Sequence, residues 1–228
     1  PPPRFSSRRR HTRYADRSRG LGDVYKRQLQ AVEDGVRQWS PQARESLQAE
    51  VDQLTGLVND LHELSLSDAG GMGYDWRELD LASLIRDVVD QYAARLEDSG
   101  LSLETELPAR PVPVKADARR LRQLFRNLLE NSCRYTDSGG RISLTCTLDE
   151  KVRLVIEDTS PGVPEDALPH LFDRLYRVEA SRNRAEGGSG LGLAICKAIA
   201  EAHGGGIQAG LSALGGLAVR IELPRDRA

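Results

Sequence analysis

The chain has 228 residues and a formal net charge of −2, with 39% hydrophobic and 29% charged residues, which is the composition of an ordinary globular protein of one or two domains. It contains no run of about 18 apolar residues that could span a membrane, and no apolar segment typical of a secretory signal follows the basic N-terminus. Cys133, Cys146 and Cys196 show no Cys-x-x-Cys spacing. We therefore expect neither a zinc site nor a disulfide scaffold.

The first 28 residues differ in composition from the rest of the chain. They carry nine basic and two acidic side chains and show no helical or alternating apolar period, so the sequence predicts disorder there. A solvated tail and a basic arm for nucleic acid or anionic lipid both agree with this charge. We favour a third interpretation, in which residues 1–28 are not native, because 6–13 and 22–28 resemble translated sequencing-adapter sequence. They are excluded from the fold prediction.

Residues 29–68 are predicted to form a helical hairpin. Apolar residues at helical spacing predict a short helix over 29–39, and Ser40-Pro41 predicts the cap and first position of a second helix. The second helix carries an apolar seam at 4-3-4-3 spacing, formed by Leu47, Val51, Leu54, Val58 and Leu61. Such a seam is typical of an antiparallel hairpin or a dimeric bundle, although it could instead pack on its own domain. Because the first arm is too short to bury the seam, we expect a truncated hairpin that forms a homodimer in the intact protein.

The rest of the chain mixes helices and strands. Glycine-rich residues 69–79 predict a linker, and the domain that follows spans 80–228. Helices are predicted after the capping residues Asp80 and Asp117, the second one reaching about Tyr135, and from Gly190 to about His203. Strands are predicted at 101–107, 112–115, 142–146, 152–156, 207–211 and 217–223, and 142–156 forms a hairpin. This order predicts an α+β fold, an α/β sandwich with helices on one face of a mixed sheet.

Polar segments within this domain suggest a nucleotide site. Asn127 and Asn131 lie four residues apart on one helical face, where two amides can bind the shell of a hard cation, with Arg134 near enough for a phosphate. A solvated polar stripe is the alternative. Asp158 ends an apolar strand, where a carboxylate can accept a hydrogen bond from an exocyclic amine or can bind its own turn.

Two further segments complete this series of motifs. Residues 171–177 precede a polar segment, 178–186, that resembles a mobile lid. The turn at 187–192 is rich in glycine and opens a helix, where unpaired N–H groups and the helix dipole favour a phosphate. Glycines can also be present only because the turn requires their backbone conformation. The motif therefore indicates a phosphate site only in combination with the other segments.

The order of these four segments resembles the N, G1, F and G2 boxes of the ATP-binding domain of sensor histidine kinases. The resemblance covers about residues 80–224, and the segments 60–68 and 127–140 are most similar to envelope-stress sensors of that family. It implies a Bergerat-type ATP-binding domain, with ATP and Mg²⁺ as cofactors. It also implies transfer of the γ-phosphate to a histidine and then to a response regulator.

Carried over residue by residue, the resemblance assigns roles. Asn131 would be the magnesium ligand, Asn127 would lie near the phosphates, and Asp158 would accept a hydrogen bond from the adenine amino group. The nucleotide-binding residues would further include Arg134, Tyr135, Gly162, Val163, Tyr176, Arg177, Gly188, Ser189, Gly190, Leu191, Gly192 and Leu193. Ser160 and Leu175 depart from the family pattern, which usually has glycine and phenylalanine there.

The phosphate-accepting histidine of this family lies in a His-Glu-Leu-Arg-Thr-Pro-Leu-like box on the first hairpin helix. His62 begins a similar segment, but Ser65-Leu66-Ser67 follows it, and it lies on the second helix. We therefore expect that His62 is not the acceptor and that His170 and His203 serve structure. The chain should bind ATP–Mg²⁺ without phosphorylating itself. It would be the cytoplasmic portion of an inner-membrane sensor, joined to the membrane through N-terminal segments that are missing here, with no nucleic-acid partner.

Two other functions remain open from the sequence. Gyrase- and chaperone-type ATPases share this fold but begin the first segment with a glutamate that activates water, whereas this chain has Asn127. An amide has no useful basicity, which favours transfer to a protein side chain over hydrolysis. A stand-alone ATPase and a non-catalytic helical module that binds a partner are the alternatives.

Overall fold

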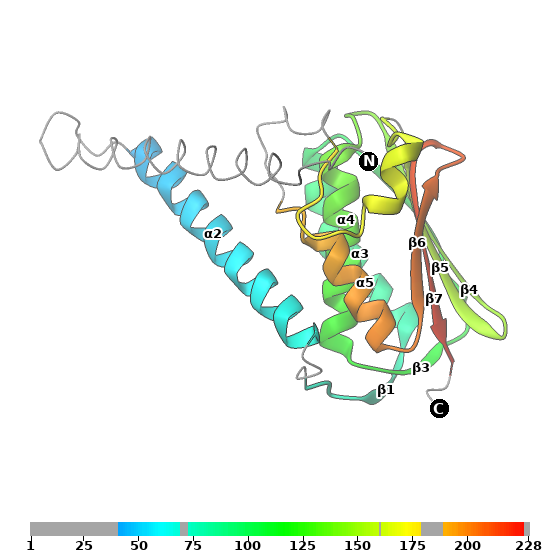
Figure 1. The fold of residues 1–228 in the computed structure, drawn as a ribbon. Coiled ribbons are helices and arrows are strands. Elements are labelled where there is room, and N and C mark those ends of the chain that lie inside the picture. The colour runs from blue at the N-terminus through cyan, green and yellow to red at the C-terminus, as the bar shows by residue number, and fades with distance from the viewer. Residues whose placement is uncertain (1–40, 69–72, 160, 179–188, 226–228) are drawn as a thin grey trace, which may run out of the picture. The chain divides into compact units, whose positions relative to one another are not determined.

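The computed structural model of the protein describes residues 41–68, 73–159, 161–178 and 189–225. The chain divides into two compact units, residues 1–55 and 56–228. Helix α2 (Pro41–Asp68), labelled in Figure 1, begins before the boundary at residue 55 and ends after it. The interpretation of residues 1–28, the predicted helix over 29–39 and the capping residue Ser40 all lie outside the described residues.

The apolar seam of α2 is exposed to solvent over most of its length. Val51, Leu54, Val58 and Leu61 are between 50% and 67% exposed. One helical turn beyond Leu61, Leu64 is only 2% exposed and belongs to the hydrophobic core of the second unit. Four of the five seam residues are thus exposed among the described residues, and the expected homodimer stays a prediction.

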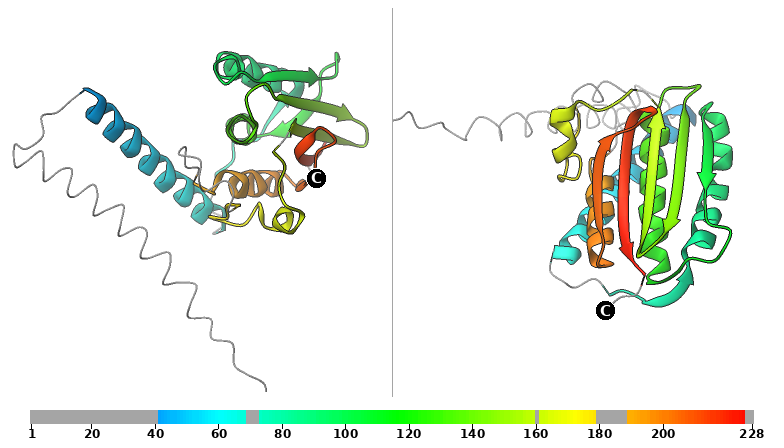
Figure 2. Two further views of the ribbon diagram at one scale, coloured as in Figure 1. Left: turned by 90° about the horizontal axis from the view of Figure 1, so that it is seen from above. Right: turned by 90° about the vertical axis from the view of Figure 1, so that its right-hand side faces the viewer.

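The second unit is built on a five-stranded mixed sheet with the strand order β2-β4-β5-β7-β6 (Figure 2). The strands are β2 (Ser102–Glu106), β4 (Arg141–Leu148), β5 (Lys151–Thr159), β6 (Gly206–Leu211) and β7 (Gly215–Pro224). β2 and β4 are parallel, and the other three pairs are antiparallel. The predicted strands and the predicted mixed sheet are confirmed.

Three helices cover one face of this sheet, as predicted: α3 (Leu81–Asp98), α4 (Ala118–Tyr135) and α5 (Gly192–Ala202) (Figures 1 and 2). Asp80 caps α3 by accepting a hydrogen bond from Ala82 N, and Asp117 caps α4 by accepting from Arg119 N and Arg120 N. Alternate residues of β4 and β5 are buried toward the helices. Burial of this apolar face against the three helices forms the core.

Two short elements were not predicted. β1 (Arg77–Asp80) begins within the predicted linker and pairs antiparallel with β3 (Pro113–Ala116) in a separate two-stranded sheet. A 3₁₀ helix, η2 (Glu165–His170), follows the segment after β5. β1 has only four residues and no apolar alternation, so it depends on the pairing with β3.

The N-terminal end of α4 is fixed by a buried histidine. Asp117 N donates to His203 Nε2 at 3.2 Å, and His203 Nδ1 lies 2.8 Å from the carbonyl oxygen of Ile199. Because Nε2 accepts a hydrogen bond, the ring proton resides on Nδ1, which donates to that carbonyl. The rings of Tyr74 and Trp76 pack edge-on against this imidazole. These contacts agree with the structural role expected for His203.

Candidate nucleotide-binding site

The C-terminal half of α4 connects the segments that the sequence singled out. On one side, Ser132 Oγ donates to Asp158 Oδ2 on β5 at 2.9 Å. On the other, Asn127 Nδ2 donates to the carbonyl oxygen of Gly192, where α5 begins, at 3.4 Å. Asn131 is partly buried on α4 and shares a face with Asn127, four residues away. Three predicted parts of the site, the amides, the strand-end carboxylate and the glycine turn, are therefore brought together.

Asp158 is a buried carboxylate held by two hydrogen bonds. Its side chain is 5% exposed, Oδ2 is bound by Ser132, and Oδ1 accepts from Leu217 N at 2.8 Å. Burial raises the pKa of Asp158 above its usual range, and the hydrogen bonds from Leu217 and Ser132 counter part of this shift. An ionised carboxylate has roughly four acceptor positions, so these two bonds leave it able to accept from an exocyclic amine.

A β-bulge directs Asp158 toward its partners. Glu157 pairs with Ala218 and Thr159 pairs with Gly215, so two residues of β7, Gly216 and Leu217, lie opposite Asp158 alone. A bulge of this kind re-aims a side chain and leaves an extra backbone N–H, here that of Leu217. A Cβ on Gly216 would collide with Asp158 Oδ1 and with the carbonyl oxygens of Asp158 and Thr159.

Three further residues of this site, Ser132, Gly216 and Leu217, were not predicted from the sequence. Ser132 follows Asn131 directly, and its position one turn after Leu128 on the buried face of α4 was a usable signal. A serine on an apolar helical face requires a hydrogen-bond partner. Gly216 and Leu217 carried no such signal, because their role depends on the register between β5 and β7.

The glycine turn packs against the segment before the predicted lid. Gly190 has a φ of +69°, and its carbonyl oxygen accepts from Leu175 N at 2.9 Å. A Cβ on Gly190 would lie 3.0 Å from backbone atoms of Leu175 and from the carbonyl oxygen of Tyr176. Leu175, which departs from the family pattern, itself has a φ of +60°. The backbone of this turn is therefore closely constrained by its neighbour in the fold.

Gly190→Ala is expected to lower the free energy of unfolding by about 1–3 kcal/mol, because alanine is strained at this positive φ and its Cβ would make close backbone contacts. Gly139→Ala is the matched control, since Gly139 has a φ of +84° but nothing within 4 Å of an added Cβ. This control variant should lower the free energy of unfolding by about 1 kcal/mol. Urea denaturation measures both. If both variants lose the same free energy of unfolding, the contacts with Leu175 and Tyr176 do not contribute to the effect of Gly190→Ala.

The remaining predicted residues lie around these segments, with one exception. Ser189 Oγ accepts from Leu191 N at 3.1 Å, and Leu191 is buried at the start of α5. Gly162 approaches β7 closely, since a Cβ there would lie 3.0 Å from the carbonyl oxygen of Gly215. Partly buried positions are occupied by Tyr135, Val163, Tyr176, Arg177 and Leu193. Gly188 lies outside the described residues.

The structure also shows where His62 and His170 lie and whether side chains that could bind a metal ion lie close together. His62 is exposed on α2, and His170 Nδ1 lies 2.9 Å from Asp173 Oδ2 in an exposed pair. Within the described ranges, no group of three or more His, Cys, Asp or Glu side chains is arranged to hold a metal ion. A magnesium ion at Asn131 would therefore rely on the amide, water and nucleotide phosphates, as is common for Mg²⁺. None of the described helices is long and apolar enough to cross a membrane.

Comparison with known proteins gives a family match and a relative of similar sequence. Residues 116–227 match the family model described as histidine kinase-, DNA gyrase B- and HSP90-like ATPase. The chain is 49% identical over 205 residues to the signal transduction histidine-protein kinase BaeS of Escherichia coli K12. That match covers 90% of this chain but 44% of BaeS, so the chain spans less than half of this relative.

Solved structures give the same assignment. The histidine kinase AdeS of Acinetobacter baumannii superposes with a TM-score of 0.75 and 26% identity, covering 92% of this chain and 97% of AdeS. Full-length ShkA in complex with AMPPNP superposes with a TM-score of 0.67 and 28% identity, covering 82% of this chain and 40% of ShkA. Residues 116–227 therefore form a domain of the histidine kinase-, DNA gyrase B- and HSP90-like ATPase family, and the relatives of the chain are sensor histidine kinases.

Proposed function

We propose that this chain binds ATP with Mg²⁺ between α4, the strand end at Asp158 and the turn at Gly190, and that it donates the γ-phosphate to a histidine side chain. One observation carries the proposal: α4 is hydrogen-bonded both to Asp158, through Ser132, and to Gly192, through Asn127. The base-recognising carboxylate and the phosphate-binding turn are thereby held on opposite flanks of the helix that carries Asn131.

Each group has a chemical role in this proposal. Asp158 accepts a hydrogen bond from the adenine amino group, and the N–H groups of Gly190 and Gly192 at the start of α5 face the phosphates. Asn131 is the protein ligand of the magnesium ion, and Arg134, three residues later on the same face, contacts a phosphate. The bound Mg²⁺ neutralises phosphate charge during transfer.

The carboxylate positions on α4 favour transfer over hydrolysis. Asn127 occupies the position where a hydrolytic ATPase of this family would carry glutamate, and an amide cannot take a proton from water. Glu130 is the nearest carboxylate on α4, but its Oε1 is bound to Arg95 at 2.7 Å and to Arg134 at 3.3 Å. The Glu130 carboxylate is thus engaged in two ion pairs, and because it directly precedes Asn131 its side chain points about 100° away around the helix.

The histidine kinase relatives support a proposal for the partners of the whole protein. The phosphoryl group would pass from a histidine to a response regulator in envelope-stress-type signalling. The exposed seam of α2 would form the homodimer, and segments outside this chain would attach the protein to the inner membrane. None of His62, His170 and His203 lies in the family's acceptor box, so the acceptor histidine would be provided by a chain that contains the box.

Calorimetric titration with a non-hydrolysable ATP analogue, with and without Mg²⁺, tests the binding. We expect binding that Mg²⁺ strengthens, and Asn131→Ala should abolish this strengthening. Gln123→Ala, which removes another amide from α4, is the matched control and should leave it intact. Loss of analogue binding in the unmodified chain would contradict the proposal.

Incubation with γ-labelled ATP tests the transfer. We expect no acid-labile phosphate on this chain alone and labelling of an added histidine-bearing helical segment from Escherichia coli BaeS. Steady release of inorganic phosphate without labelling of the acceptor would instead identify a stand-alone ATPase.

A further inference from the structure

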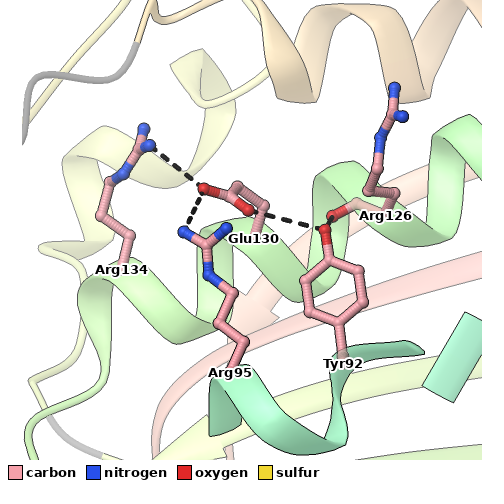
Figure 3. Close-up of polar contacts among 5 residues, drawn as sticks. All are labelled: Tyr92, Arg95, Arg126, Glu130 and Arg134. Atoms are coloured by element: carbon pink, nitrogen blue, oxygen red, sulfur yellow. Dashed lines mark hydrogen bonds and ion pairs between the residues drawn. The ribbon is translucent and has the colours of Figure 1, made fainter. Parts of the chain in front are cut away.

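A cluster of ion pairs joins α3 to the nucleotide-facing half of α4. Glu130 lies at its centre, between Arg95 of α3 and Arg134 of α4 (Figure 3). Tyr92 and Arg126 border the cluster, and the Tyr92 hydroxyl donates to the carbonyl oxygen of Arg126 at 3.3 Å. The cluster lies beside Asn131, which is the residue directly after Glu130.

Two arginines compete for one oxygen of Glu130. Arg95 Nη2 lies 2.7 Å from Oε1, whereas Arg134 Nη2 lies 3.3 Å from the same atom. The shorter contact identifies Arg95 as the stronger partner, because charge-assisted hydrogen bonds are strongest below about 2.9 Å. If Arg95 were absent, Glu130 would pair more strongly with Arg134, because a Glu–Arg pair at i,i+4 on a helix is a favourable arrangement.

Tyr92 contributes little to this charge balance. Its hydroxyl lies 3.5 Å from Glu130 Oε2, at the limit of a hydrogen bond. Burial, together with the nearby Glu130 charge, raises the pKa of Tyr92 to about 12, so the phenol stays neutral at physiological pH. The positive charge that balances Glu130 from outside α4 therefore comes from Arg95.

We propose that Arg95 is a positioning residue for the phosphate end of the site: its contact with Glu130 Oε1 offsets the negative charge that Glu130 places beside Asn131 and the nucleotide phosphates. This inference rests on the proposed function, in which Arg134 contacts a phosphate. Without Arg95, the Glu130 carboxylate loses the shorter of these two Oε1 contacts and keeps the longer one from Arg134. The carboxylate then also repels the phosphates through its uncompensated charge.

The test compares Arg95→Gln with Arg122→Gln. Arg122 of α4 is a matched control, because it also pairs across α3 and α4, with Asp87 at 3.8 Å, and its side chain is 48% exposed against 54% for Arg95. Affinities for ATP, ADP and adenosine are measured by calorimetry for each protein. Arg95→Gln should weaken ATP binding about three- to tenfold, ADP binding less, and adenosine binding not at all. Arg122→Gln should change none of them.

A rescue variant separates this role from a structural one. Arg95→Gln combined with Glu130→Gln removes the pair together with its charge, and it should restore ATP affinity to within about twofold of the unmodified chain. The inference is overturned if Arg95→Gln weakens ATP and adenosine equally, if it changes neither, or if the double variant stays weak. In each of these cases ATP binding by the unmodified chain would still support the proposed function, whereas failure of the unmodified chain to bind ATP would overturn both.

Discussion

Replacing Asp158 by asparagine should weaken binding of ATP, ADP and adenosine alike, each by about ten- to a hundredfold, because the change removes a charged acceptor at the base and leaves the phosphate end intact. The asparagine side chain can keep the fold, since its oxygen can still accept from Leu217 N. The Ser132 hydroxyl can turn to accept from the new amide. Calorimetric titration measures the three affinities. An unchanged affinity for adenosine would remove Asp158 from the site.

The same variant should be at least as stable as the unmodified chain at neutral pH. Burial raises the pKa of Asp158, so the folded state disfavours the ionised form. The stability linked to this group is therefore fully present below the ordinary pKa of aspartate and is lost as pH rises through the raised value. The gain in stability of Asp158→Asn over the unmodified chain should therefore appear above the raised pKa of Asp158 and vanish in acid. Thermal unfolding at several pH values would measure it.

Glu157→Gln is the matched control for both measurements. Glu157 is the neighbouring carboxylate on β5, is only partly buried, and accepts from Ser212 Oγ at 3.2 Å. Consecutive residues of a strand point to opposite faces, so Glu157 should not reach the nucleotide. A loss of adenosine affinity in Glu157→Gln equal to that of Asp158→Asn would mean that general loss of negative charge, and not the base contact, causes the effect.

Gly216→Ala should lower the free energy of unfolding by about 3 kcal/mol or more, because the added methyl group meets fixed backbone and the Asp158 carboxylate. A Cβ at Gly216 would collide with Asp158 Oδ1 and with two carbonyl oxygens of β5. Relief requires β7 to move away from β5, which would lengthen the bond from Leu217 N to Asp158. Urea denaturation measures the stability, and the affinity for adenosine should fall in the same variant.

Gly206→Ala controls for the general effect of replacing a strand glycine. Gly206 begins β6, and nothing lies within 4 Å of an added Cβ. Glycine is unfavourable in a strand interior, so this change should be neutral or stabilise by up to about 1 kcal/mol. If Gly216→Ala and Gly206→Ala have similar free energies of unfolding, the bulge opposite Asp158 can widen without loss of stability.

Local signals predicted most of the helices and strands. The limits of α4 could be predicted because Asp117 is a capping residue and apolar residues repeat at helical spacing up to Tyr135. The hairpin of β4 and β5 could be predicted because alternation and turn lie within one short segment. β1 could not, because four residues without alternation form a strand only when β3 lies opposite.

The site was predictable in its residue types but not in its connections. Asn127, Asn131, Asp158 and Gly190 stand in motifs that indicate their chemistry, whereas the bonds that join them cross long sequence separations. Ser132 is 26 residues from Asp158, and Leu217 is 59 residues from it. Glu130 directly precedes Asn131, so helix geometry alone turns its side chain about 100° away from that amide. Its pairing with Arg95 depends on the packing of α3 against α4, which no local pattern specifies.

The bond between Leu217 N and Asp158 also governs when the site can form during synthesis. β5 acquires β4 as its neighbour at once, but its second neighbour, β7, emerges from the ribosome only after α5 and β6. Until then β5 presents an open hydrogen-bonding edge, and such edges favour aggregation of nascent chains. The carboxylate at its end meanwhile lacks one of its two donors. Nucleotide can therefore stabilise the nearly finished protein but cannot assist the earlier steps of its folding.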